Sequence, residues 1–267
     1  MTRVDRCLLL GLLAALFGVP VLTLHAFAAH LGGAVSVRGP GDDPGLLNIL
    51  ALNGAAFVPG LLAVSALVRW WKGAMAVSAL RGAGRRATED GIHFTVVPLG
   101  RPLVFVAGWR RPAIVVSEAA VERMTPAMLR AALLHEDAHR RAGDHRWRAG
   151  VAMVRSAFGF LPGVGTLADA VVLRSEFAAD REALAQGAGR RPLFEAVVLC
   201  ADAGLAAPAL SGGAVEARLA RIADPAAKAT ENLPGLPLAA AGAWAMGLPV
   251  AAHVLLFAGI LCHPAMG

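Results

Sequence analysis

The chain has 267 residues, enough for one or two compact units with a sizeable core. Hydrophobic residues make up 57% and charged residues 16%, against roughly 45–50% and about 25% in an ordinary soluble domain. This balance argues against an ordinary soluble domain and predicts membrane-spanning helices. The net charge of +6 comes without a nucleic-acid-binding motif, so we expect an anionic lipid bilayer as a partner and no direct binding of nucleic acid.

Three apolar segments are long enough to cross a bilayer, which takes about 20 residues. They are Leu8–Ala28, Leu46–Val68 and Leu236–Cys262. Arginine and lysine precede the first segment and follow the second, so the positive-inside rule predicts a multi-pass protein of the cell membrane. Its N-terminus and central region would be cytoplasmic and its C-terminus outside. Because Ala26-Phe27-Ala28 resembles a signal-peptidase site, cleavage of the first segment is an open alternative.

After a charged linker, Gly82–Gly91, the central region is expected to begin with short strands and continue as a helix. Apolar and β-branched runs predict three strands, at His93–Val97, Leu103–Ala107 and Ala113–Val116. The second of them could bind an extended polypeptide by β-augmentation. Thr125 is a suitable N-cap, Pro126 suits the first helical position, and Gly143 ends the predicted helix.

This helix contains the pattern H-E-x-x-H. His135 and His139 are four residues apart, so both imidazoles project from one face and can share a zinc ion. Glu136 lies about 100° round the helix and can reach a water molecule at the metal. The competing interpretation is a solvated helix face, because charged residues surround the motif.

A catalytic zinc ion usually has three protein ligands and leaves a fourth position for water. Glu176 and Asp180 are four residues apart on a second predicted helix that continues to about Gln186. Glu176 could be the third ligand, and Asp180 could orient a ligating histidine. The alternative is that both are exposed charges that pair with Arg174 and Arg181.

Residues 98–184 resemble the BlaR/MecR-type family of integral-membrane zinc metallopeptidases, through GWRRPAIVVSEAAVERMTPAMLRAALLHEDAHRRAGDH, FGFLPG and RSEFAADREAL. The resemblance implies one zinc ion per chain, bound by His135, His139 and Glu176, with Glu136 as the catalytic glutamate. No extracellular sensor domain is found after the last apolar segment, so antibiotic sensing does not carry over. The HtpX-like and CAAX-prenyl endopeptidases are the alternative family, although they typically have a longer insert between the two motifs.

The expected fold is a mostly α-helical membrane protein with about three transmembrane helices and a cytosol-facing, zincin-like α+β domain. The expected domains are residues 1–72 with two transmembrane helices, 73–234 with the metallopeptidase, and 235–267 with the last transmembrane helix. The apolar stretch Ser156–Leu173 must return to the same side if Glu176 shares a metal ion with His135. We therefore expect an interfacial or shallow re-entrant helix pair that turns at Pro162-Gly163.

The predicted reaction is hydrolysis of a peptide bond with Glu136 as general base. The chain has no tyrosine, so His145 or a nearby arginine is expected to stabilise the oxyanion, and the sequence does not choose between them. By resemblance the substrate is a cytosolic transcriptional repressor, and membrane proteins are the alternative. A zinc-binding membrane regulator without turnover is the alternative function.

Overall fold

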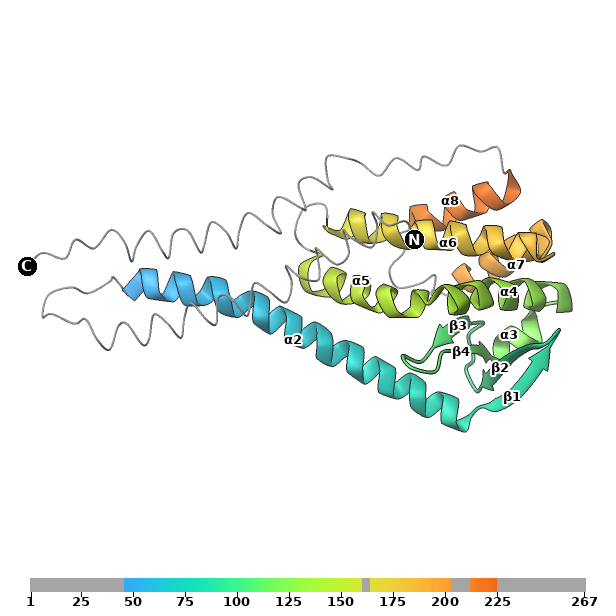
Figure 1. Ribbon diagram of the computed structural model, residues 1–267, viewed down its shortest axis with the longest axis horizontal. Coiled ribbons are helices and arrows are strands. Elements are labelled where there is room, and N and C mark those ends of the chain that lie inside the picture. The colour runs from blue at the N-terminus through green and yellow to red at the C-terminus, as the bar shows by residue number, and fades with distance from the viewer. Residues whose placement is uncertain (1–45, 160–163, 203–211, 225–267) are drawn as a thin grey trace, which may run out of the picture.

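The computed structural model describes residues 46–159, 164–202 and 212–224 (Figure 1). Within these residues a long helix comes first, followed by four strands and six further helices. These elements are α2 (Leu46–Ala83), β1 (Arg85–Glu89), β2 (Ile92–Val97), β3 (Val104–Ala107), β4 (Ala113–Ser117), α3 (Glu118–Arg123), α4 (Pro126–Ala142), α5 (Asp144–Phe158), α6 (Val164–Ala185), α7 (Arg190–Cys200) and α8 (Gly212–Ala223). The three strands expected from the sequence are therefore present, at β2, β3 and β4.

The four strands form one mixed sheet in the order β1-β2-β4-β3. The β2–β4 pair is parallel, and the other two pairs are antiparallel. The stretch expected to be a charged linker in fact contains β1, which forms a hairpin with β2. Asp90 and Gly91 at the turn have φ values of 47° and 78°, as a two-residue hairpin requires.

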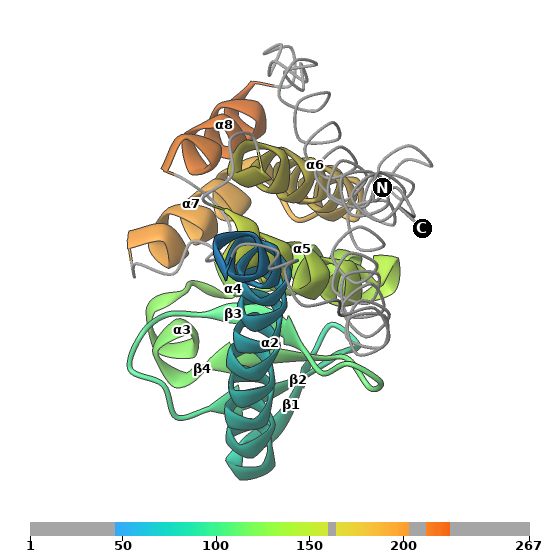
Figure 2. The same cartoon turned by 90° about the vertical axis from the view of Figure 1, so that its left-hand side faces the viewer.

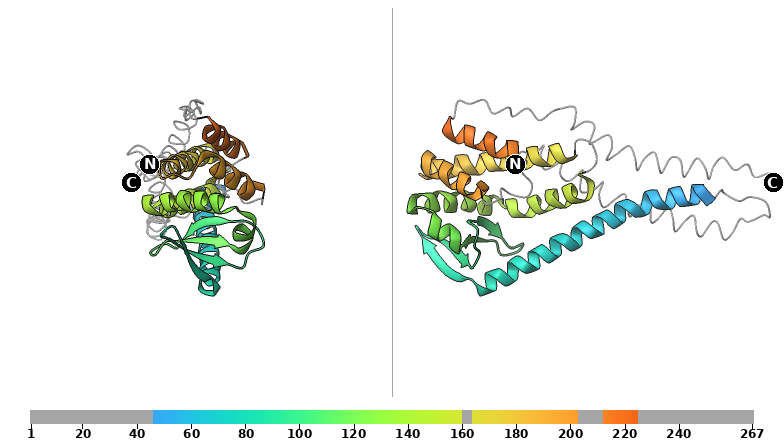
Figure 3. Two further views of the ribbon diagram at one scale, coloured as in Figure 1. Left: turned by 90° about the vertical axis from the view of Figure 1, so that its right-hand side faces the viewer. Right: turned by 180° about the vertical axis from the view of Figure 1, so that it is seen from behind.

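The sheet is covered on both faces because β4 alternates between them. Ile114 and Val116 face α4 and pack with Leu133, whereas Val115 faces the other way and packs with residues near Val77 of α2. Figures 2 and 3 show the resulting layers, with α4 and α5 between the sheet and the group formed by α6, α7 and α8. Helix α4 is thus enclosed between the sheet and the other helices.

Helices α5 and α6 contain most of the stretch Ser156–Leu173 and pack against each other, but nothing in the described residues supports the expected interfacial or re-entrant placement in a membrane. In Figure 1, α5 leads away from α4 and α6 returns alongside it, and buried residues such as Val151 and Val172 pack between α5 and α6. The predicted turn at Pro162-Gly163 lies outside the described residues. The return of the chain places Glu176 beside α4.

The expectation of membrane-spanning helices has to be corrected. Within the part of the chain that the structure describes, no helix is long and apolar enough to cross a membrane. The predicted span Leu46–Val68 is the first part of α2, a single helix of 38 residues that ends at Ala83. The other two predicted spans, Leu8–Ala28 and Leu236–Cys262, lie outside the described residues.

This finding contradicts the predicted fold class, a mostly α-helical membrane protein with about three transmembrane helices. It also contradicts the predicted location in the cell membrane, with N-terminus and active site cytoplasmic and C-terminus outside. Part of the apolar composition has another physical origin, because many alanines are buried where the elements pack together. Examples are Ala131, Ala132, Ala183 and Ala196, each at most 8% exposed.

Candidate metal centre

Helix α4 positions the two histidines, and its ends are set by local sequence. The Thr125 hydroxyl accepts a hydrogen bond from the Met128 N–H at 3.3 Å, and Pro126 occupies the first turn. Gly143 ends the helix in the left-handed conformation, with φ 71° and ψ 22°. The helix therefore runs unbroken through the H-E-x-x-H motif and presents both imidazoles to α6.

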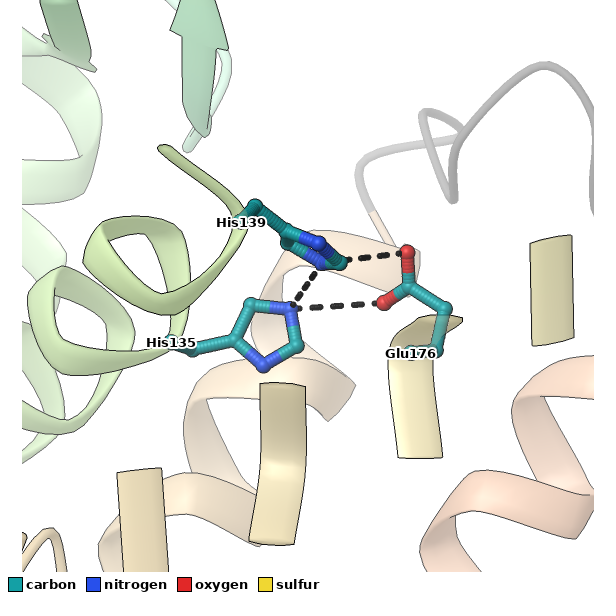
Figure 4. Close-up of side chains that lie close together, drawn as sticks. All are labelled: His135, His139 and Glu176. Atoms are coloured by element: carbon teal, nitrogen blue, oxygen red, sulfur yellow. Dashed lines mark hydrogen bonds and ion pairs between the residues drawn. The ribbon is translucent and has the colours of Figure 1, made fainter. Parts of the chain in front are cut away.

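His135 and His139 from α4 and Glu176 from α6 meet in one buried group (Figure 4). The two Nε2 atoms are 3.1 Å apart, and the Glu176 oxygens lie 3.3 Å from His135 Nε2 and 3.5 Å from His139 Nε2. A tetrahedral metal ion with bonds of about 2.0–2.2 Å holds its ligand atoms roughly 3.3 Å apart. The spacing of these three donors fits such an ion, and the group could hold a metal.

A carboxylate lies against the far nitrogen of each imidazole. Asp180 Oδ1 lies 2.8 Å from His135 Nδ1, and Asp144 Oδ2 forms a 2.8 Å hydrogen bond with His139 Nδ1. Carboxylates in these positions favour a proton on Nδ1 and orient the rings, so that the two Nε2 atoms face each other. The arrangement is typical of histidines that bind metal ions.

Two arginines reach the same group from different helices. Arg218 of α8 donates to both oxygens of Asp180, at 3.0 and 2.8 Å, and its Nη1 lies 2.7 Å from Glu176 Oε2. Arg148 of α5 pairs with the other Glu176 oxygen, Oε1, and its Nη1 lies 3.3 Å from His139 Nε2. Each oxygen of the Glu176 carboxylate therefore has an arginine partner.

These arginines keep Glu176 ionised although it is only 3% exposed. Burial raises the pKa of a carboxyl group, but the charges of Arg218 and Arg148 outweigh it and hold the pKa of Glu176 well below its usual range. An ionised carboxylate is the form that binds a metal ion. Glu176 is thus a charged donor at any pH near neutrality.

The buried carboxylates raise the pKa values of the two histidines. Burial lowers the pKa of His135, but Asp180 and Glu176 outweigh it and raise this pKa to about 9. The pKa of His139 is also raised, because its contacts with Asp144 and Glu176 outweigh its burial. The group of carboxylates therefore favours positive charge at the point where the two Nε2 atoms meet.

Glu136 follows His135 on α4 and is half-buried. Its carboxylate forms no hydrogen bond or ion pair with another described residue, but its charge acts on Arg218 and on Cys200 of α7. Burial and then Glu136 raise the pKa of Cys200 to about 11, so that this thiol is neutral. Glu136 is thus the chain neighbour of a donor histidine, and its charge acts on an arginine that contacts the donor group.

The alternative of a solvated helix face does not hold for the two histidines, which are 6% and 5% exposed. The exposed face of α4 lies elsewhere and carries Arg140 and Arg141, both paired with Asp137. Asp180 and Glu176 are likewise buried, so they are not the exposed charges of the alternative interpretation.

Three residues of the site were missed in the sequence: Asp144, Arg148 and Arg218. Asp144 directly follows the glycine that ends α4, and this position could have suggested it as a partner for His139. The sequence did not indicate the contact between Arg218 and Asp180, because the two are 38 residues apart. His145, one candidate for stabilising an oxyanion, lies near Trp109 in the β3–β4 turn, and its pKa is lowered chiefly by burial.

The identity of the metal and its chemistry have to be inferred from the geometry of the group itself. Its donors, their spacing, their burial and their charge partners are all defined by described residues. Comparisons with protein-family models, curated proteins and solved structures found no match.

Proposed function

We propose that the protein is a zinc-dependent endopeptidase in which His135, His139 and Glu176 bind one zinc ion per chain. The observation that carries the proposal is the meeting of two imidazole nitrogens and one carboxylate at ligand spacing, directly beside Glu136 of the same H-E-x-x-H motif. Nitrogen and oxygen donors of this kind suit zinc. Three protein ligands leave one position open, as a catalytic site requires.

When bound, zinc would supply a Lewis acid that activates water and polarises the peptide carbonyl group. Glu136 accepts a proton from the attacking water while the water oxygen bonds to the carbonyl carbon. Glu136 then delivers this proton to the amide nitrogen as the C–N bond breaks, which releases a new carboxyl terminus and a new amino terminus. A carboxylate without a hydrogen bond or ion pair to another described residue is suited to this exchange.

The proposed substrate is a polypeptide, and β3 offers a place for it. This strand is at the edge of the sheet and beside α4. An extended segment of substrate could pair by β-augmentation with the outer edge of β3, which pairs with no strand among the described residues. The resemblance to the BlaR/MecR-type family further favours a regulatory protease that acts on a transcriptional repressor.

The test compares the wild type with Glu136→Gln and with Glu122→Gln, whose side chain is exposed on α3. We expect all three proteins to bind one equivalent of zinc, measured by elemental analysis. Cleavage of fluorescein-labelled casein should fall by about 10²–10⁴-fold in Glu136→Gln, since it loses its general base, and be unchanged in Glu122→Gln.

Two results contradict the proposal in different ways. One is that the protein binds one equivalent of zinc and yet shows no Glu136-dependent cleavage of casein or of the chain itself. It would then be a metal-binding protein without peptidase activity. If His135→Ala and His139→Ala hold as much zinc as the wild type, the metal site itself is wrong.

A further inference from the structure

The Arg148 side chain reaches the atoms that would face the metal ion. Its Nη1 contacts Glu176 Oε1 and lies 3.3 Å from both His139 Nε2 and the Ser175 hydroxyl. Since Nε2 and Oε1 are donor atoms themselves, the guanidinium lies directly beside the position that a metal ion would occupy. Among the described residues, Arg218 is the other cation in contact with these donors.

The two arginines differ in how firmly they are held. Arg218 makes two hydrogen bonds to Asp180 and an ion pair with Glu176, and its side chain is 10% exposed. Arg148 contacts one oxygen of Glu176, its charge also acts on Asp144 without a direct ion pair, and its side chain is 21% exposed. Arg148 can therefore turn toward a bound molecule, whereas Arg218 is fixed.

The charge of Glu176 does not prevent this movement. If Arg148 turns away from Oε1, the other carboxylate oxygen keeps its contact with Arg218 at 2.7 Å. The buried carboxylate is then still neutralised, and the large cost of an unpaired buried charge is avoided. Arg218 is thus a positioning residue that leaves Arg148 free to act.

We propose that Arg148 donates a hydrogen bond to the carbonyl oxygen of the scissile peptide and stabilises the charge that develops there, an inference that rests on the proposed function. When the water oxygen bonds to the carbonyl carbon, the electron pair of the C=O bond moves onto the carbonyl oxygen. The guanidinium stays protonated and transfers no proton. The pair returns when the C–N bond breaks, so the arginine acts only through charge and hydrogen bonding. The chain has no tyrosine for this role.

The experiment uses Arg148→Gln, Arg148→Lys and the control Arg146→Gln. Arg146 is on the same helix, and its side chain is exposed near the Trp109 carbonyl oxygen. For each protein we would measure kcat and KM on a fluorogenic peptide and zinc affinity by competition with a chromophoric chelator. A third measurement is the Kd of N-phosphoryl-Leu-Trp, whose tetrahedral phosphoryl oxygens resemble the oxyanion.

We expect Arg148→Gln to lower kcat by about 10²–10³-fold, with KM and zinc affinity within about threefold of the wild type. Binding of the phosphoryl dipeptide should weaken by about 10²-fold, and Arg148→Lys should recover part of both losses because it restores the charge. Arg146→Gln should match the wild type in every measurement.

The inference fails if Arg148→Gln resembles Arg146→Gln, or if its only defect is loss of zinc. It also fails if the Arg148→Gln substitution weakens binding of the phosphoryl dipeptide no more than it weakens binding of a hydroxamate that contacts only the metal. The proposed function fails separately, and the inference with it, if the wild type shows no cleavage that depends on both zinc and Glu136.

Discussion

At the residue scale, every donor of the metal centre has a partner that fixes it. His135 and His139 each have a carboxylate at Nδ1, and Glu176 has an arginine at each oxygen. The sequence could predict the donors, because spacings of four residues on a helix place side chains on one face. It could not predict Arg148 and Arg218 as partners, because their contacts depend on how four helices pack.

Replacing Asp180 tests how much these partners contribute to zinc binding. Asp180→Asn removes the charge that orients His135 and holds Arg218, so we expect zinc affinity to fall by about 10–100-fold. Chelator competition measures the change. Asp137→Asn is the control, because Asp137 pairs with arginines on the exposed face of the same helix. Equal zinc affinities for the two variants would contradict this account of Asp180.

At the element scale, the helix that carries the motif was predicted in detail, whereas the hairpin before it was not. The ends of α4 are set by local backbone chemistry at Thr125, Pro126 and Gly143, and these residue types can be recognised in the sequence alone. The Asp90-Gly91 pair is an equally local signal for a hairpin turn. Its strand, β1, is mostly polar and half-exposed, so the apolar runs used to predict strands did not include it.

Gly143 joins α4 to α5 and so brings Asp144 to His139. A Cβ at this position would meet no atom within 4 Å, so the cost of Gly143→Ala comes from the left-handed backbone alone. We expect the free energy of unfolding to fall by about 1–2 kcal/mol, measured by urea denaturation. Gly73→Ala, in an open position of α2, is the control and should not destabilise. Equal stability of the two variants would show that Gly143 is not strained.

At the scale of the whole molecule, the metal centre joins helices that are far apart in the sequence. The donors come from α4 and α6, and the arginines from α5 and α8. A ligand that binds only the folded state stabilises it through its binding free energy. A metal ion at this junction should therefore stabilise the described helices together.

We expect zinc at a free concentration of about 100 times its Kd to raise the free energy of unfolding by about 2.7 kcal/mol. Urea denaturation with zinc and with EDTA measures the difference. The effect should be absent in His135→Ala and retained in His93→Ala, because His93 lies on β2 next to Thr88 and away from the site. The same stabilisation in both variants would place the zinc ion elsewhere.

The sequence by itself determined the ends of the motif helix, its two histidines on one face, and a second helix with Glu176 and Asp180. These features follow from helical period and backbone capping, which act over a few residues. Only the tertiary structure brought Glu176 to the histidines and added Arg148 and Arg218, because these contacts come from the packing of distant helices. Within the described residues it also contradicted the membrane-spanning fold, because no helix there is long and apolar enough to cross a membrane. Composition counts apolar residues without showing that alanines such as Ala131 and Ala183 pack against neighbouring elements.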